Sequence, residues 1–282
     1  MFRTASFHEF TTKAYVPPPE LHCFIKLIGE IEGEPQHQNL RFMPAMDSHI
    51  TFNLSPEPMT TILNGSKEYV LKNVVSHGVR KYLSDMNLGK KLHFLTVYIE
   101  PAAFRTWFKM PAGVLANDYI AGDLISREQV FLHEQLLACA DFPARVKIIE
   151  QWIKKMAGML PVIKQDYIVE FLKGRLTRTI FPNEKELMRE SGYSVVALRR
   201  RFKNEMGVSM KSYAEVIRLH SVIKHLLQYN GDDTLSVAVQ FGFYDQSHFC
   251  HTVKKYTGYS PFALKTNMLQ QGYHSLAAWY LQ

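Results

Sequence analysis

The chain has only three cysteines among its 282 residues, and Cys23, Cys139 and Cys250 lie far apart. This odd, scattered set supports neither a disulfide framework nor a cysteine-based zinc site, and it fits a reducing cytoplasm. No run of about 18 apolar residues occurs, which argues against a transmembrane helix. The first residues contain no apolar segment of the kind found in secretion signals. We therefore expect a cytoplasmic protein with no membrane partner.

The His-x-His pair of metal-dependent β-barrel enzymes is also missing, because the twelve histidines are scattered along the chain. A metal site would need such a pair together with a further carboxylate and histidine. His77 and His93 could meet in space, but a single barrel histidine is more often a hydrogen-bonded core residue. We predict no metal, cofactor or catalytic residue. A cupin-type metal enzyme fused to a helical domain is the weaker alternative.

Acidic residues are scarce in the second part of the chain. Residues 1–160 carry 17 lysines and arginines against 16 acidic residues, whereas residues 161–282 carry 16 against 10. A basic part joined to a nearly neutral one indicates an anionic partner for the basic part, although a solvated cationic surface is the alternative. With 46% hydrophobic and 21% charged residues, the composition is that of a folded protein, and its length predicts two domains.

The first hundred residues are predicted to be β-rich. The clearest strands cover residues 41–54 and 91–100, and turn signals at Asn64-Gly65 and His77-Gly78 favour a sandwich or barrel. The strand at 91–100 has large side chains on both faces, which indicates burial on both sides or the lining of a cavity. After Pro101 the apolar period changes, and helices are expected at 102–109, 127–138 and 144–156.

These features predict a β-rich, cupin-like N-terminal domain over residues 1–158 that ends in helices. An apolar stripe on its last helix packs either on its own barrel or on a second subunit of a homodimer; the stripe is Val146, Ile149, Ile153 and Met156. Five aromatic residues are candidates for a small-molecule effector pocket, with plain core as the alternative: Phe52, Phe94, Tyr98, Phe104 and Trp107. A domain without an effector, which only dimerises, is a rival hypothesis.

Residues 162–268 are predicted to be all-helical, followed by a tail at 269–282, which makes the whole fold α+β. A weak internal repeat relates 187–213 to 237–264. Gly192 matches Gly242 at an offset of 50, and Gly207 matches Gly258 at an offset of 51. In each copy a glycine ends a short helix, and a capping side chain, Ser194 or Asp245, starts the next one.

Each copy therefore has the sequence pattern of a helix-turn-helix unit. Apolar pairs four residues apart point inward, Leu198 with Phe202 and Phe249 with Val253. The opposite faces of the two second helices are polar or cationic. They comprise Val195, Val196, Arg199, Arg200 and Lys203 in the first copy, and Gln246, Ser247, Cys250, His251 and Lys254 in the second. An ordinary helical bundle with solvated surface charges is the alternative, but two such copies in the basic part of the chain favour DNA binding.

The second copy resembles the bacterial AraC/XylS family of transcription regulators. It reads Gly242-Phe-Tyr-Asp-Gln-Ser-His-Phe-Cys-His-Thr-Val-Lys-Lys and continues Tyr256-Thr-Gly-Tyr-Ser-Pro-Phe. The first copy, from Ser191-Gly-Tyr-Ser through Leu198-Arg-Arg-Arg-Phe-Lys, is also typical of the family. The resemblance covers about residues 162–268, and the N-terminal half, residues 1–158, looks like the β-rich domains for effector sensing or dimerisation that are attached to many members of the family. The second copy departs from the family where His251 replaces the usual arginine and Val253 the usual phenylalanine.

The resemblance implies a domain in which residues 210–228 form a rigid helix between two reading helices on double-stranded DNA. Such a helix spans roughly 28 Å, which suits major-groove segments about 34 Å apart. The geometry of their side chains suits Arg199 and Arg200 to guanine, Gln246 to adenine, and Val195 and Val196 to thymine methyl groups. Ser247 and His251 are less selective donors, and Cys250 is a further candidate for a base contact. The predicted phosphate contacts are Arg201, Lys203, Lys254 and Lys255. An activator would also contact RNA polymerase; the sequence does not distinguish activation from repression.

Overall fold

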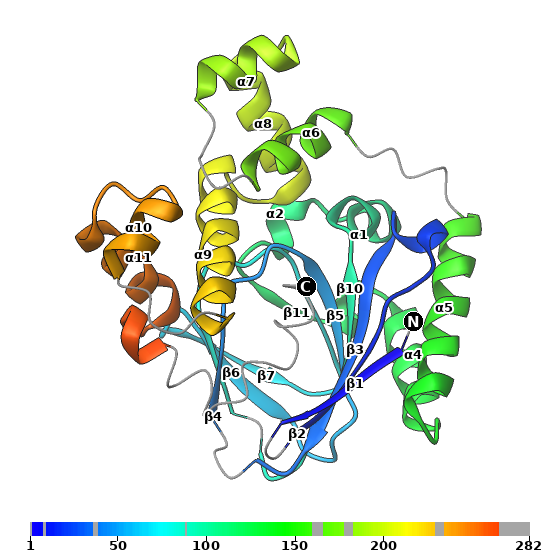
Figure 1. Ribbon diagram of the computed structural model, residues 1–282. Coiled ribbons are helices and arrows are strands. Elements are labelled where there is room, and N and C mark those ends of the chain that lie inside the picture. The colour runs from blue at the N-terminus through cyan, green and yellow to red at the C-terminus, as the bar shows by residue number, and fades with distance from the viewer. Residues whose placement is uncertain are drawn as a thin grey trace.

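The computed structural model describes residues 2–7, 10–35, 39–87, 89–159, 166–177, 183–228 and 234–264. Two antiparallel sheets build the N-terminal half (Figure 1). The larger sheet has the strand order β1-β2-β3-β10-β5-β8-β11, and the smaller has the order β4-β9-β6-β7. The strands are β1 (Phe2–Phe7), β2 (Phe10–Tyr15), β3 (Ile25–Gly33), β4 (Asn39–Phe42), β5 (Ser48–Asn53), β6 (Met59–Leu63), β7 (Lys67–Leu71), β8 (Val74–His77), β9 (Ser84–Asn87), β10 (Leu92–Ile99) and β11 (Tyr119–Ala121).

Helices follow in two groups. After the short 3-10 helix η1 (Pro19–Leu21), the first group belongs to the N-terminal half: α1 (Pro101–Phe108), α2 (Ala112–Leu115), α3 (Gly122–Ile125), α4 (Arg127–Leu137) and α5 (Phe142–Met159). The second group is α6 (Tyr167–Leu176), α7 (Glu184–Ser191), α8 (Val195–Met206), α9 (Met210–Gln228), α10 (Thr234–Gln240) and α11 (Gln246–Thr257). The cupin-like β-rich half followed by a helical half confirms the predicted α+β fold class.

The structure differs from the sequence-based expectation at two places. The single strand expected at 41–54 is divided into β4 and β5, which belong to different sheets. Residues 119–121, between the helices expected at 102–109 and 127–138, form the unexpected strand β11. This strand pairs with β8 through Tyr119 and His77 and adds the seventh strand of the larger sheet. Both differences come from long-range pairing, which outweighs the local pattern in so short a segment.

Strand β10 lies at the centre of the larger sheet and separates two apolar layers. Leu95, Val97 and Ile99 face a core cluster that includes residues of α1, α4 and α5. Phe94 belongs to a cluster between the two sheets. The expected burial of both faces of this strand is therefore confirmed. The stripe Val146, Ile149, Ile153 and Met156 on α5 is buried in the first of these clusters, so it packs on the chain's own barrel.

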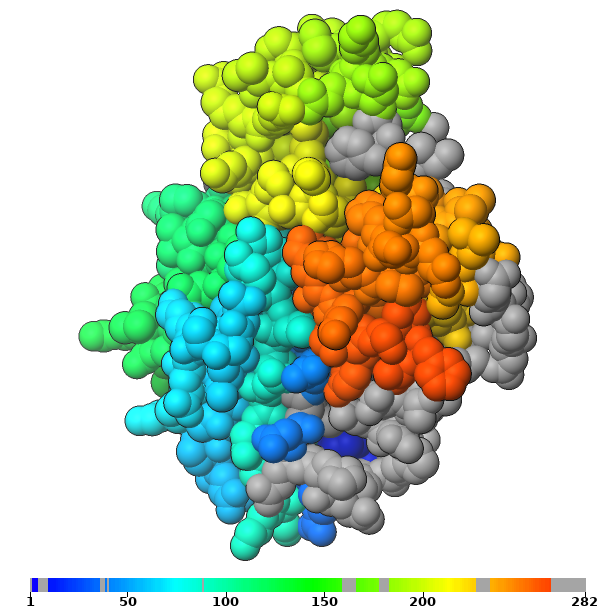
Figure 2. All heavy atoms as spheres, turned by 90° about the vertical axis from the view of Figure 1, so that its left-hand side faces the viewer, coloured from blue at the N-terminus to red at the C-terminus, as the bar shows by residue number. Residues whose placement is uncertain are grey.

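The two halves share an apolar core. Met43, Met46 and Val79 of the β-rich half belong to the same buried cluster as the helices α6 to α11. Polar contacts surround it: Arg105 of α1 pairs with Glu205 of α8 at 2.9 Å, and His220 of α9 is bonded to the carbonyl oxygen of Pro44 at 2.8 Å. Figure 2 shows the end of the helical half, in orange, directly beside the blue and cyan strands. The helical half is therefore packed on the barrel in this structure.

The predicted domain limits at 158 and 162 fall where the structure describes α5 up to Met159 and α6 from Tyr167 onward. The limits themselves stay a prediction, and the tail at 269–282 lies outside the described residues. Among the helices within the described ranges, none has the length and apolar character needed to cross a membrane.

Candidate nucleic-acid interface

The first helix-turn-helix unit consists of α7 and α8. Helix α7 ends at Gly192, whose φ of +74° is accessible to glycine without strain. Two residues later the side chain of Ser194 accepts a hydrogen bond from the backbone N–H of Ala197 and starts α8. Leu198 and Phe202 are completely buried. These local features fix which face of α8 points outward, as the sequence predicted.

The outward face of α8 is cationic. Val196 is 70% exposed, and Arg199, Arg200 and Lys203 are exposed beside it. Val195, predicted on the same face, is only half-buried. Arg201 is held by two contacts: it pairs with Asp166 at 2.8 Å, and its guanidinium lies 4.8 Å from the ring centroid of Tyr193. Arg201 therefore ties α8 to the start of α6.

The second unit, α10 and α11, repeats this construction. Gly242 has a φ of +67°, and Asp245 accepts a hydrogen bond of 2.6 Å from the backbone N–H of His248 at the start of α11. Phe249 and Val253 are completely buried. The exposed residues of α11 include Gln246, Ser247, His251, Lys254 and Lys255, whereas Cys250 is half-buried against the helical core.

Helix α9 joins the two units. Its 19 residues correspond to about 28 Å, and Val216, Leu219 and Val222 are buried in the shared core. Arg218 of α9 reaches the second unit, where its guanidinium lies 4.4 Å from the ring centroid of Phe243 and donates a hydrogen bond to the carbonyl oxygen of Gly242. Burial lowers the pKa of Arg218. Both units are thus fixed to one helix.

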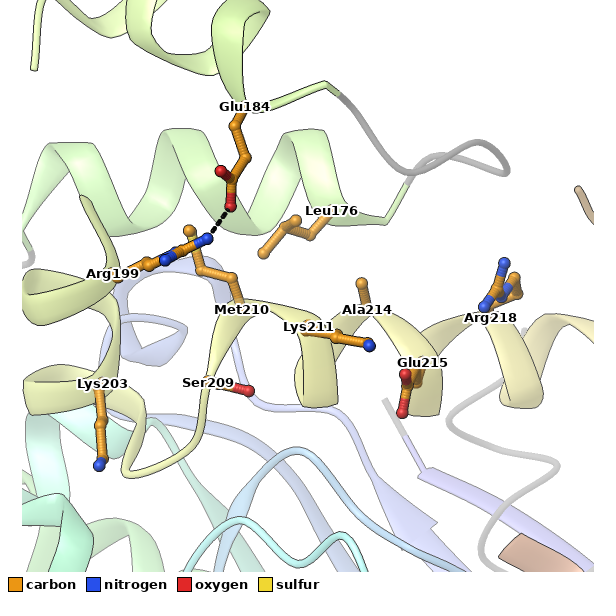
Figure 3. Close-up of a pocket in the computed structure, with 10 residues that line it drawn as sticks. All are labelled: Leu176, Glu184, Arg199, Lys203, Ser209, Met210, Lys211, Ala214, Glu215 and Arg218. Atoms are coloured by element: carbon orange, nitrogen blue, oxygen red, sulfur yellow. Dashed lines mark hydrogen bonds and ion pairs between the residues drawn. The ribbon is translucent and has the colours of Figure 1, made fainter. Parts of the chain in front are cut away.

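A groove of about 550 Å³ lies between α8 and α9 (Figure 3). Four cationic side chains and two acidic ones contribute to its lining, which consists of Leu176, Glu184, Arg199, Lys203, Ser209, Met210, Lys211, Ala214, Glu215 and Arg218. Figure 3 shows the lining side chains of α9 in succession along one side of that helix. The groove leads from the outward face of α8 toward the second unit, so its net positive charge suits a polyanion.

Sequence reasoning missed the α9 side of this groove. It treated residues 210–228 only as a connector, although Lys211 and Arg218 lie seven residues apart, a spacing that returns to the same helix face. It also missed the contact between Glu184 of α7 and Arg199 of α8. The helical period of the sequence indicates that Lys211 and Arg218 share a face of α9. The contact between Glu184 and Arg199 depends instead on how α7 lies beside α8.

The five aromatic residues predicted to line an effector pocket fall in three separate core clusters. Phe52, Phe104 and Trp107 lie between the larger sheet and its helices, and Phe94 lies between the two sheets. Tyr98 belongs to a third cluster, with its ring centroid 4.2 Å from that of His49. The structure therefore does not bring the five together around one cavity. Phe52 pairs with Leu95 and lies on the opposite face of the larger sheet from Phe94 and Tyr98, which share a face of β10 but lie four residues apart.

His77 and His93 do not meet. His77 shares a hydrogen bond of 3.1 Å with His49, which it faces across β5 and β8, whereas His93 projects from the opposite face of the larger sheet. Burial, together with the charge of Arg80, lowers the pKa of both His49 and His77, so both are neutral near pH 7.

Among the described residues, one cluster has metal-ligand chemistry: Glu30, Glu32 and His93. Protein cations already pair with Glu30, the most buried of the three. The Nζ atom of Lys13 lies 3.2 Å from its carboxylate and the Nη1 atom of Arg145 lies 2.9 Å from it. The cluster is therefore part of a buried ion-pair network that ties β2, β3 and α5 together.

Comparisons with known proteins agree with this arrangement. Residues 187–267 match the family described as a helix-turn-helix domain, and residues 13–121 match a domain of unknown function, DUF6597. No curated protein matches the chain.

Three solved structures illustrate the similarity. ToxT from Vibrio cholerae O395 is 14% identical over 94% of this chain and 98% of that one, with a TM-score of 0.46. The C-terminal domain of AraT, a response regulator from Geobacillus stearothermophilus, is 21% identical over 36% and 82%, with a TM-score of 0.32. A probable AraC family regulator from Rhodopseudomonas palustris CGA009 is 20% identical over 36% and 92%, with a TM-score of 0.31.

The family match covers both α8 and α11 together with α9, and so includes every element of the interface described above except α6 and the first turn of α7. Residues 187–267 therefore form a helix-turn-helix domain of the AraC type, and the chain is a DNA-binding transcription regulator.

Proposed function

We propose that α8 and α11 enter two successive major-groove segments on one face of a DNA duplex and read the bases there. The observation that carries the proposal is the pair of outward faces, set by two equivalent turns and held by one helix. In α8, Arg199 and Arg200 each offer the planar fork that pairs with the O6 and N7 atoms of guanine. Val195 and Val196 contact thymine methyl groups.

In α11, the proposed readers are Gln246, Ser247, Cys250 and His251. Gln246 suits adenine, because its amide can donate to N7 while accepting from N6. Ser247 and His251 are less selective, and the half-buried position of Cys250 limits it to a short contact beside them. The readers of α11 carry fewer charges than those of α8, so we expect α8 to contribute more of the base discrimination.

The phosphate contacts in this proposal come from Lys203, Lys254 and Lys255, joined by Lys211 and Arg218 on the groove side of α9. The cationic lining of that groove supports this role, since cations that neutralise phosphates position a protein without reading sequence. Arg201, also predicted to contact phosphate, would first have to leave Asp166.

We further propose that the N-terminal half controls this activity, either by binding a small effector or by dimerising. The shared core of the two halves supports the coupling, because a change in the barrel near Met43, Met46 or Val79 reaches the helical half directly. An activator of this design would also contact RNA polymerase. The proposal assigns no enzymatic step to the barrel.

A base-reading role for Arg199 and a phosphate-contacting role for Lys203, one turn further along α8, predict different results when each is replaced. Arg199→Ala is expected to cost about 1–3 kcal/mol on the preferred duplex and to relax the base preference at one position. Lys203→Ala is expected to weaken binding to preferred and scrambled duplexes alike and to lower the salt slope by about one unit. The measurement is the affinity of each full-length variant for both duplexes over a salt series.

The preferred duplex for these titrations comes from selection of a randomised duplex library with the unaltered chain. Lys185→Ala, an exposed lysine on α7 away from the groove lining, is the control for loss of one positive charge. Equal losses on both duplexes for Arg199→Ala would show that Arg199 contacts phosphate and that α8 enters the groove in another register.

A further inference from the structure

The first residue of α7 and the first residue of α10 hold equivalent places in the repeat. Glu184 and Thr234 are 50 positions apart, the same offset that relates Gly192 to Gly242. Each makes a side-chain contact with a residue proposed to read bases in the following helix. Glu184 accepts a short hydrogen bond from Nη2 of Arg199, and Thr234 accepts one from Nε2 of Gln246. The two readers differ in position, since Arg199 is the fifth residue of α8 and Gln246 the first of α11, but in both units the first residue of the preceding helix contacts a proposed reader.

The hydrogen bond to Glu184 in the first unit leaves Arg199 able to contact a base. A guanidinium has five N–H donors, and one bond to Glu184 leaves four. The side chains are well exposed, 60% for Arg199 and 44% for Glu184, so the pair contributes little to folding stability. Its effect is instead to restrict the orientation of a long side chain that otherwise samples many rotamers.

A carboxylate at this place has a cost for DNA binding. Glu184 lies in the groove with Arg199, Lys203, Lys211 and Arg218, where its charge opposes that of the cations that attract phosphate. Such a group lowers the affinity for every duplex, matched or not. An acidic residue in a cationic surface is understandable if it improves discrimination between sequences, because selectivity depends on the difference between affinities.

We propose that Glu184 and Thr234 are positioning residues that hold Arg199 and Gln246 in the orientation needed for base reading, and so set the sequence selectivity of the domain. This inference rests on the proposed reading roles of α8 and α11. Glu184 acts through the charge and direction of its carboxylate. Thr234 acts through its hydroxyl oxygen, which fixes the plane of the Gln246 amide.

The test uses the full-length protein, a duplex selected from a randomised library, and the set of its single-base variants. Glu184→Gln is expected to reduce discrimination at the position read by Arg199 by about two- to fivefold, without reducing the affinity for scrambled duplex. The matched control is Glu186→Gln. It removes the same charge from the same helix, two residues away at an exposed position that does not line the groove, and is expected to leave discrimination unchanged.

The second unit offers a conservative rescue. Thr234→Val removes the hydroxyl with little change in shape and is expected to reduce discrimination at the position read by Gln246. Thr234→Ser retains the oxygen and is expected to restore it. Thermal unfolding of each variant is measured in parallel, and an unchanged transition separates a positioning role from a structural one.

The outcomes separate this inference from the function on which it rests. If Arg199→Ala abolishes discrimination at one position and Glu184→Gln leaves it intact, Arg199 reads bases but Glu184 does not position it, and the inference for the first unit is overturned. If Arg199→Ala leaves discrimination intact at every position, the reading role fails and the inference fails with it. Equal effects of Glu184→Gln and Glu186→Gln would show a general charge effect and would also overturn it.

Discussion

Arg145→Met is expected to lower the free energy of unfolding by about 3–5 kcal/mol, because it leaves a buried carboxylate without its nearest charge partner. Glu30 on β3 is completely buried, and its Oε2 atom lies 2.9 Å from Nη1 of Arg145 on α5. Arg145 also donates hydrogen bonds to the carbonyl oxygens of Leu136 and Cys139, at and just beyond the end of α4. One side chain therefore joins the barrel to both of its long helices.

Chemical denaturation of the full-length protein measures this loss, with Lys155→Met as the control. Lys155 lies on α5, like Arg145, and pairs with Glu128 of α4. Because that pair is exposed, its loss is expected to cost about 0–1 kcal/mol. Combining Arg145→Met with Glu30→Gln removes both charges and is expected to recover part of the stability. A loss as small as that of Lys155→Met would show that Lys13 alone neutralises Glu30.

The loss caused by Arg145→Met is also expected to depend on pH. Burial raises the pKa of Glu30, but the neighbouring His93 and the charges of Arg145 and Lys13 outweigh burial and bring this pKa below its ordinary value. The ionised carboxylate therefore stabilises the fold above the unfolded pKa of about 4.3, and this contribution is lost as the pH falls through the lower folded value. The difference in the free energy of unfolding between Arg145→Met and the unaltered chain should therefore be largest near pH 7 and decrease in acid.

The second large effect is expected at Gly207, the glycine that ends α8. Its φ of +74° equals that of Gly192, which ends α7. A Cβ atom at Gly192 would meet nothing within 4 Å, whereas one at Gly207 would lie 2.6 Å from the carbonyl oxygen of Ala112 and 2.8 Å from Cβ of Ala116. Gly192→Ala thus reports backbone strain alone, and Gly207→Ala reports the same strain together with a collision against α2.

We expect Gly192→Ala to cost about 1–2 kcal/mol through its left-handed backbone, and Gly207→Ala to cost about 1–3 kcal/mol more through overpacking. Denaturant titration of both full-length variants gives the comparison. Because Ala112 belongs to the β-rich half and Gly207 to the helical half, the excess measures how firmly the two halves are held together at this contact. Equal losses would mean that α2 moves aside freely.

The second reading helix has its own contact of this kind. A Cβ atom at Gly258, which ends α11, would lie 2.4 Å from Nη1 of Arg41 on β4. The end of Arg41 is more adaptable than a backbone carbonyl, although its bond of 2.6 Å to Asp85 limits its movement. Both reading helices thus end against the β-rich half, which relates the placement of one to that of the other through the barrel as well as through α9.

Much of the interface could be predicted from the sequence because its chemistry is local. A glycine with positive φ, a capping serine or aspartate two or three residues later, and an apolar pair four residues apart determine where a helix begins and which face it buries. All of these lie within about a dozen consecutive residues of each unit. Their repetition at an offset of 50 or 51 made two copies recognisable, and the boundaries of α9 followed from the turns on either side.

The sequence determined the turns, the helix faces and the concentration of positive charge in residues 161–282. Only the tertiary structure decided which side chains meet across elements: Glu184 with Arg199, His77 with His49, and Met43 with the helical core. It likewise distributed the five aromatic residues among three clusters. The physical reason is that capping and periodicity act between neighbours along the chain, whereas these contacts depend on strand register and on how helices pack, which no short segment specifies by itself.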